Sequence, residues 1–159
     1  DTLNLYCDSL HYNGKTRKAM LWGNVRVRDN TFKLTTDSLE YDSRKGQAVY
    51  RHGGKVESST GSEVLTSNIG YFYPDSKSSF FKGNVHYKSP EVEMATDTLK
   101  YVYSKQTTYF YGPTSIVTKD ANMFCESGWY NLDTEEGSLE KNAVIIQESK
   151  IIKGAISFY

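Results

Sequence analysis

The chain has 159 residues, a length that suits one domain with a hydrophobic core. Basic residues (Lys and Arg) and acidic residues (Asp and Glu) number 19 each, so the charge balance argues against a nucleic-acid-binding surface. The longest uncharged apolar stretches, such as AVII at 143–146, have four residues, which is far too short for a transmembrane helix.

The residue types favour strands. There are 13 Tyr, 7 Phe and only 3 Pro, and Tyr, Thr, Val and Ser outweigh Ala and Leu. The chain starts in mid-pattern with neither an initiator Met nor a signal peptide, so we expect residues 1–159 to be a single domain from a longer protein.

The first clear element covers residues 18–28. Its apolar and small residues alternate with polar or large ones, which predicts a strand with one buried face. That face carries Ala19, Leu21, Gly23, Val25 and Val27. No stretch of eleven residues sustains helical spacing.

Turn-forming segments then punctuate the chain in two alternating series. One series contains NGKT at 13, DSRKG at 42, PDSK at 74, SKQ at 104 and DTEEG at 133. The other contains RDN at 28, STGS at 59, SPE at 89 and KDAN at 119. Strands joined by such short turns are expected to run up and down as antiparallel neighbours.

An internal repeat of about 29 residues organises these elements. A mostly acidic column recurs with spacings of 29, 31, 29 and 29 residues, at Asp8, Asp37, Asn68, Asp97 and Glu126. Two residues later stand Leu10, Leu39, Gly70, Leu99 and Gly128, and four residues later stand Tyr12, Tyr41, Phe72, Tyr101 and Tyr130. The sequence therefore predicts about five copies of a two-strand unit.

A glycine column predicts where each long strand bends, because glycine tolerates a tight backbone. It comprises Gly23, Gly54, Gly83 and Gly112, with Lys141 in the fifth place. Two residues earlier stand Leu21, His52, Phe81, Phe110 and Leu139. The predicted fold is all-β: an elongated, semi-open β-jelly roll with two facing antiparallel sheets.

Catalytic and metal-binding functions are not expected. A carboxylate ladder for metal binding or acid–base chemistry is one interpretation of the acidic column, but recurrence in every copy favours a structural role at strand corners. His11, His52 and His86 lie in different columns, and no HExxH, GxSxG or Walker motif is present. We therefore predict no enzyme, cofactor or metal site.

No disulfide is expected either. Cys7 and Cys125 occupy the same column four copies apart, which places them on the order of 38 Å from each other at about 4.8 Å per strand. A disulfide requires Cα atoms within about 7 Å.

The inward columns define the candidate site. They line either a dry core or a groove for an extended apolar ligand, and periodicity alone leaves both open. These residues are Leu10, Tyr12, Leu21, Val25, Leu39, Tyr41, Val56, Phe72, Phe81, Val85, Leu99, Tyr101, Phe110 and Tyr130.

Several segments resemble the OstA-like fold of the LptA family of periplasmic lipopolysaccharide-transport proteins. They are AMLWGNVRV at 19–27, LTTDSLEYD at 34–42, FFKGNVHY at 80–87, MATDTLKYV at 94–102 and IIKGAISFY at 151–159. The resemblance covers essentially the whole chain. It implies a β-jelly roll with a V-shaped interior that carries lipid A acyl chains, and open ends that join head to tail across the periplasm.

The resemblance also implies the partners. They are lipopolysaccharide or a related lipid, other jelly-roll proteins of the same pathway paired through edge strands, and further copies of this chain. The phosphorylated head group is expected near Arg26, Arg28 or Lys88. The alternatives are a structural or adhesive surface module with a dry core, and a glycan-binding module that uses Trp22, Tyr109, Tyr111 and Trp129 as stacking platforms.

Overall fold

The computed structural model describes residues 3–159, which form β-strands joined by short turns. Within these residues the one helix is a short 3-10 turn, η1 (Tyr103–Lys105), so no helix is long and apolar enough to span a membrane. The strands are β1 (Asn4–Tyr6), β2 (Ser9–Asn13), β3 (Lys18–Arg28), β4 (Phe32–Asp42), β5 (Gln47–Tyr50), β6 (Gly54–Ser58), β7 (Val64–Ser67), β8 (Ile69–Tyr73), β9 (Ser78–Lys88), β10 (Val92–Val102), β11 (Thr107–Thr118), β12 (Asn122–Asn131), β13 (Gly137–Glu140), β14 (Val144–Gln147), β15 (Lys150–Lys153) and β16 (Ile156–Phe158).

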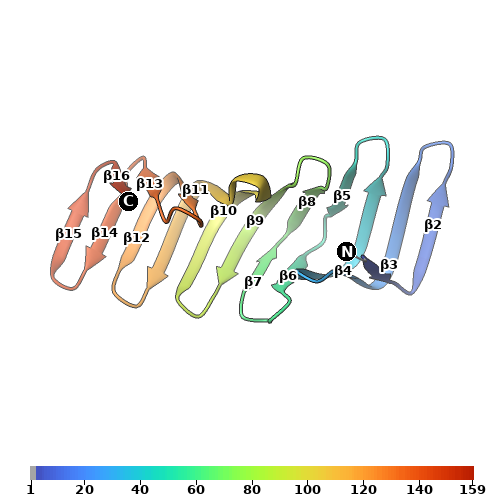
Figure 1. Cartoon of the computed structure of the whole chain (residues 1–159), viewed down its shortest axis with the longest axis horizontal. Helices are drawn as coiled ribbons and strands as arrows, with labels where there is room; N and C mark the ends of the chain where they lie inside the picture. Colours follow the sequence, from blue (N-terminus) through green and yellow to red (C-terminus); the bar gives the residue numbers. More distant parts are fainter. Residues whose placement is uncertain (1–2) are drawn as a thin grey trace.

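All the strands belong to one continuous antiparallel sheet (Figure 1). The main path runs β1-β3-β4-β5-β8-β9-β10-β11-β12-β13-β16, and the remaining strands pair alongside it. The predicted all-β class and up-and-down topology are confirmed. The two facing layers are halves of this single sheet, because each long strand bends at mid-length and contributes to both.

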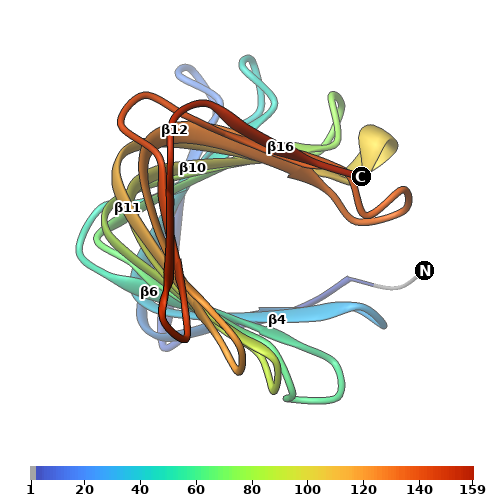
Figure 2. The ribbon, with the colours of Figure 1, turned by 90° about the vertical axis from the view of Figure 1, so that its left-hand side faces the viewer.

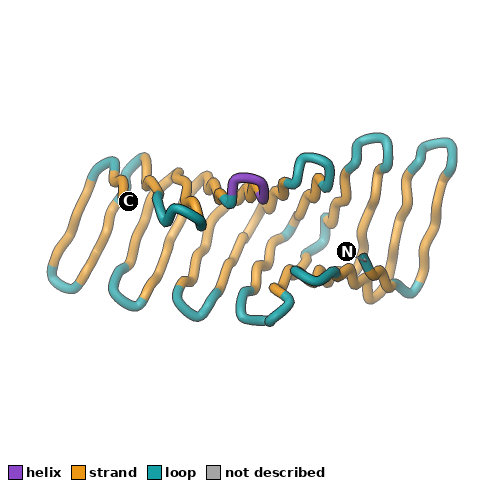
Figure 3. The backbone as a smooth tube through the Cα atoms, viewed as in Figure 1, coloured by secondary structure: helices purple, strands orange, loops and turns teal. Residues whose placement is uncertain are grey.

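The bend gives the molecule a C-shaped cross-section (Figure 2). We call the line of bends the elbow. The layer that contains β2, β5, β8, β13 and β16 is the upper layer, and the layer that contains β1, β6, β7, β14 and β15 is the lower layer. The long strands cross the elbow and contribute one half to each layer. The turns along the outer margin of the upper layer form the upper lip, and those along the outer margin of the lower layer form the lower lip. Figure 3 shows these turns in teal along the top and the bottom of the molecule.

Left-handed backbone produces the elbow. In β3, Gly23 has φ 73° and Asn24 has φ 47°, and the register with β4 shifts at this point. Gly83 and Asn84 repeat the pattern in β9, with φ 75° and 46°. Glycine adopts this conformation without a Cβ penalty and asparagine tolerates it, so the predicted bends are confirmed at Gly23 and Gly83, whereas in the second copy the left-handed residue is Gly53 and not the predicted Gly54.

Acidic side chains stabilise the bends from the neighbouring strand. The Asp8 carboxylate accepts a hydrogen bond from the Asn24 amide nitrogen at 3.0 Å, and the Glu126 carboxylate accepts one from the Asn142 amide at 3.1 Å. At these two positions the structural interpretation of the acidic column is confirmed.

The upper turns repeat the same backbone geometry. Each contains one residue in the left-handed region, with φ between 46° and 59°, at Arg17, Gly46, Lys77, Gln106 and Glu135. Neighbouring turns are joined: the Ser43 N–H donates to the Arg17 carbonyl at 3.1 Å, and the Tyr103 N–H donates to the Lys77 carbonyl at 2.9 Å. The upper lip is therefore a hydrogen-bonded row of turns.

One predicted column position is wrong. The sequence alignment places His52 in the column of Leu21, whereas the structure places Tyr50 there, at the end of β5 and opposite Gly70 of β8. The residues between Tyr50 and Gly54 form the link across the elbow, and they account for the longer spacing of 31 residues in this copy.

Candidate functional site

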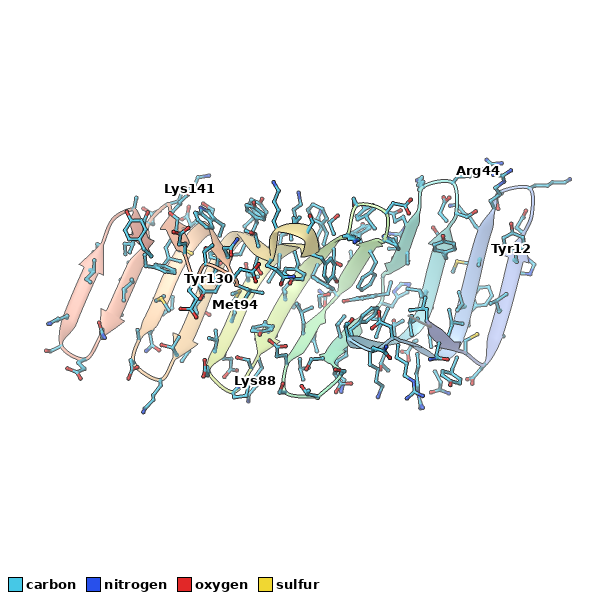
Figure 4. The ribbon with its side chains drawn as sticks, in the orientation of Figure 1. Tyr12, Arg44, Lys88, Met94, Tyr130 and Lys141 are labelled. Carbon is cyan, nitrogen blue, oxygen red and sulfur yellow. The ribbon has the colours of Figure 1, made fainter. Side chains whose placement is uncertain are left out.

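A row of aromatic residues follows the inner face of the upper layer, close to its lip. Each ring on one strand lies opposite a small residue on the next, so that the rings have room. In register order the row reads Tyr12, Ala19, Tyr41, Ala48, Phe72, Ser79, Tyr101, Thr108, Tyr130, Gly137 and Phe158. We call it the lip row. Figure 4 labels Tyr12 near the first edge and Tyr130 on β12.

A second row lies one step closer to the elbow, and we call it the spine. It contains Leu10, Leu21, Leu39, Tyr50, Gly70, Phe81, Leu99, Phe110, Gly128, Leu139 and Ile156. Except near the two ends of the sheet, its side chains are buried.

Aromatic rings fill the glycine positions of the spine. A methyl group added to Gly70 would meet the Tyr50 ring at 2.3 Å, and one added to Gly128 would meet the Phe110 ring at 2.4 Å. These glycines therefore admit rings from the neighbouring strand and do not widen the interior. The elbow side of the interior is tightly packed.

Tyr50 is the central residue of this packing. Its ring covers Gly54 in the lower layer as well as Gly70 in the upper layer, and its hydroxyl is hydrogen-bonded to the Ser67 hydroxyl. Burial raises the pKa of Tyr50 to about 12, an effect only partly offset by the bond from Ser67. Tyr50 ties the two layers together at mid-length.

The buried threonine hydroxyls at the elbow are paired within the described chain. Thr36 donates to the Gly53 carbonyl at 2.7 Å, and the hydroxyls of Thr96 and Thr114 are 2.8 Å apart. Such groups are costly to bury unless they are paired, and Thr36, Thr96 and Thr114 therefore have no free hydroxyl for a polar ligand.

The lower layer carries a third inward row, which we call the lower row. It contains Leu5, Val27, Leu34, Val56, Leu65, Tyr87, Met94, Ile116, Met123, Ile145 and Ile152. Met94 packs against both buried core clusters and lies near mid-length in Figure 4. The Tyr87 hydroxyl donates to the Glu63 carboxylate at 2.7 Å. The pKa of Tyr87 is raised to about 12, mainly because the phenol is buried and secondly because the Glu63 carboxylate is close.

Together the three rows cover the inner face between the lips, and we call this mostly apolar face the gutter. No position in these rows is charged in the part of the chain that the structure describes. Exposure increases from the buried spine toward the lip row, where Tyr41 is 40% exposed. Partly exposed aromatic and aliphatic side chains without charge are suited to an apolar, extended ligand.

The structure places all fourteen predicted groove residues on the inward face, at three depths. Leu21, Val25, Leu39, Phe81, Val85, Leu99 and Phe110 are buried; Val56, Phe72, Tyr101 and Tyr130 are partly buried; Leu10, Tyr12 and Tyr41 are exposed. The inward columns predicted from the sequence do not include Tyr50, Leu65, Met94 and Met123. Period-two alternation counted from Leu99 or Tyr130 places Met94 and Met123 on the wrong face, because the register of β10 and β12 shifts at the elbow.

The gutter is open at both edges of the sheet. At the first edge, Leu10 and Tyr12 of β2 are 57% and 58% exposed because no strand lies beyond them. At the other edge, Ile152 of β15 is 48% exposed. Large apolar residues that are exposed at a strand edge are typical of a contact surface.

Potential metal ligands and the two thiols do not form a cluster in the described part of the chain. Across residues 3–159, no group of three or more His, Cys, Asp and Glu residues is placed to hold a metal ion. Cys7 and Cys125 are both free thiols, on opposite sides of the long run of strands from β3 to β11.

A comparison with protein-family profiles agrees with the motifs in the sequence. The profile of the OstA-like protein family matches residues 1–97. No curated protein matches the chain. Among solved structures, a match is LptH, described as the LptA-homologous periplasmic component of the conserved lipopolysaccharide transport device from Pseudomonas aeruginosa. The identity is 12% and the TM-score 0.38, with 99% of this chain and 94% of that chain covered.

Proposed function

The chain belongs to the OstA-like protein family, and from this premise we propose that it is a lipid-transport module of the periplasm that shields lipopolysaccharide acyl chains in the gutter. Its motifs resemble those of periplasmic lipopolysaccharide-transport proteins. The observation that carries this proposal is that uncharged, mostly apolar rows run from one open edge of the sheet to the other.

The driving force in this proposal is physical. Acyl chains that leave water gain roughly 25 cal/mol for each Å² of apolar surface that becomes buried. The spine is already packed, so the chains lie between the lip row and the lower row, against side chains such as Tyr41, Tyr101 and Met94. The ligand therefore occupies the outer part of the gutter.

The phosphorylated head group stays in water beside the lower lip. Arg28 and Lys88 end β3 and β9 next to the lower turns, which favours them over Arg26, two residues farther from that lip. The Arg28 guanidinium lies 5.9 Å from the centre of the Tyr6 ring, so its position is partly fixed.

Transfer takes place through the open edges. The outer sides of β2 and β16 carry backbone groups without a strand partner in the described chain. Edge pairing with another copy, or with another jelly-roll protein of the pathway, makes the gutter continuous from one subunit to the next.

Site-specific photo-crosslinking tests the gutter. Tyr41 and Trp22 lie on adjacent strands with similar exposures of 40% and 43%, but Tyr41 faces the gutter and Trp22 faces outward. A benzophenone amino acid at position 41 should capture lipid A, whereas the same label at position 22 should not. Equal capture at both sites would contradict the gutter. No capture at either site would favour a structural module with a dry core.

A further inference from the structure

The outer face of the upper layer carries a second aromatic row, separate from the gutter. Cross-strand pairs run Tyr71 to Phe80, Phe80 to Lys100, Lys100 to Tyr109 and Tyr109 to Trp129. These five residues lie on β8, β9, β10, β11 and β12, and we call them the outer strip. All five are partly exposed.

The outer strip is local, although the sheet is repetitive. Along the same register line, His11, Met20, Glu40 and Val49 occupy the first copies, and Ser138 and Ser157 occupy the last. Tyr, Phe and Trp are thus absent from this line elsewhere in the described chain. Aromatic rings gathered on a water-facing surface mark a binding site more often than scattered single residues do.

Cations accompany the rings. The Lys100 ammonium lies 5.2 Å from the centre of the Phe80 ring, and the Arg51 guanidinium lies 6.0 Å from that of Tyr71. In the next row toward the elbow, Lys82 of β9 and Tyr111 of β11 are the cross-strand neighbours of Thr98 of β10. Tyr111 is 45% exposed. Within residues 3–159, neither Lys82 nor Lys100 has a carboxylate at ion-pair distance.

We propose that the outer strip is a binding site for an anionic oligosaccharide. The flat C–H face of a pyranose packs on aromatic rings, whose faces carry partial negative charge. The hydroxyls of Tyr71 and Tyr109 supply hydrogen-bonding partners for sugar hydroxyls, and Lys82 and Lys100 face carboxylate or phosphate groups. The strip contains no Leu, Ile or Met, which a lipid or an apolar protein surface would favour.

Trp22 provides an internal comparison. It also faces outward from the upper layer and is 43% exposed, but its cross-strand neighbours are Ser9 and Ser38. A lone ring between serines offers one contact, whereas the outer strip offers a line of rings long enough for several sugar units.

Tryptophan fluorescence tests this site in the full chain. The chain has two tryptophans, so a Trp22→Phe variant leaves Trp129 as the only reporter. Titration with a galacturonate hexamer should change Trp129 emission, and neutral cellohexaose should bind at least about tenfold more weakly. In calorimetry, Tyr109→Ala and Trp129→Ala should each weaken galacturonate binding about tenfold, whereas Trp22→Phe should leave it unchanged.

Three outcomes overturn the proposal: no response to either hexamer, equal binding of both, or a loss of binding in Trp22→Phe as large as in Trp129→Ala. Circular dichroism of each variant separates a lost site from a lost fold. Lipid A capture at position 41 should survive Tyr109→Ala, because the outer strip does not rest on the lipid-transport proposal. Either proposal can therefore fail without the other.

Discussion

At the scale of single residues, Tyr50 links the stability of the interior to pH. Its pKa is raised to about 12 by burial, while an unfolded tyrosine titrates near its ordinary pKa of about 10. The folded state therefore prefers the neutral phenol. This preference contributes fully below about pH 10 and is lost as the pH rises toward about 12.

Alkaline denaturation should reveal this contribution. We expect the free energy of unfolding to fall by about 2 to 3 kcal/mol because of Tyr50 between about pH 10 and 12. Tyr50→Phe keeps the ring over Gly54 and Gly70 but has no ionisable group, so its stability should fall less steeply. Urea titrations of both proteins at a series of pH values measure the difference. If the free energy of unfolding fell equally with pH in both proteins, the loss of stability could not be assigned to Tyr50.

The two cysteines should differ sharply in reactivity. Burial raises the pKa of Cys125 to about 11, and its side chain is 5% exposed. Because the thiolate is the reactive form, Cys125 should resist alkylation at neutral pH. Cys7 lies near the first edge and is only partly buried. Iodoacetamide labelling with peptide mass spectrometry should show Cys7 modified first, and both thiols modified at similar rates in urea. Faster labelling of Cys125 in the folded protein would refute the packing described for β12.

At the scale of elements, two glycines separate backbone strain from elbow packing. Gly23 and Gly61 share a φ of 73°, but an added methyl group would lie 2.3 Å from the Asp8 carboxylate at Gly23 and would meet nothing within 4 Å at Gly61. Gly61→Ala should cost about 1 kcal/mol for the left-handed backbone alone, whereas Gly23→Ala should cost about 1 to 3 kcal/mol more. Urea denaturation measures both. Equal losses would show that the contact between Asp8 and Gly23 contributes nothing.

The strand pattern explains which elements the sequence could predict. Side chains alternate between faces with period two, so once the recurring columns were aligned, Leu39 and Tyr41 were placed on the same inner face. The glycine column located the bends because left-handed backbone favours glycine.

Side-chain reach explains what the sequence could not predict. The Tyr50 ring extends over glycines on two other strands, and no column in a linear alignment records that contact. The irregular link between β5 and β6 shifted this copy by two residues and placed His52 where Tyr50 stands. The depth of each groove residue also depends on neighbouring strands, so Leu10 and Leu21 occupy the same face with very different exposures.

At the scale of the whole molecule, charge is distributed unevenly along the upper lip. The turn between β2 and β3 carries Lys15 and Arg17, whereas the turn between β12 and β13 carries Asp133, Glu135 and Glu136. In a head-to-tail stack, these two turns would lie at the same junction. Complementary charge of this kind favours a fixed orientation of the copies.

Self-association should therefore depend on salt and on these turns. Sedimentation at low salt should show that the double variant Lys15→Glu/Arg17→Glu associates more weakly than the unmodified chain, by about two- to fivefold for each lost charge pair. Near 1 M salt the two proteins should differ little, because salt screens the charges. Mixing this variant with Asp133→Lys/Glu135→Lys should restore association. Lys77→Glu provides a matched control, because Lys77 has the same left-handed turn position as Arg17 but lies at mid-length. Equal weakening by Lys77→Glu would exclude a junction-specific effect.

The direction of the edge strands has a mechanical consequence for such a stack. The first edge (β1 and β2) and the last edge (β15 and β16) both run from the lower lip toward the upper lip. Copies stacked in one orientation would therefore meet in a parallel seam, although the strand pairings within residues 3–159 are antiparallel. Parallel pairing is slightly weaker per residue, so under load a filament would separate at its seams and release intact subunits.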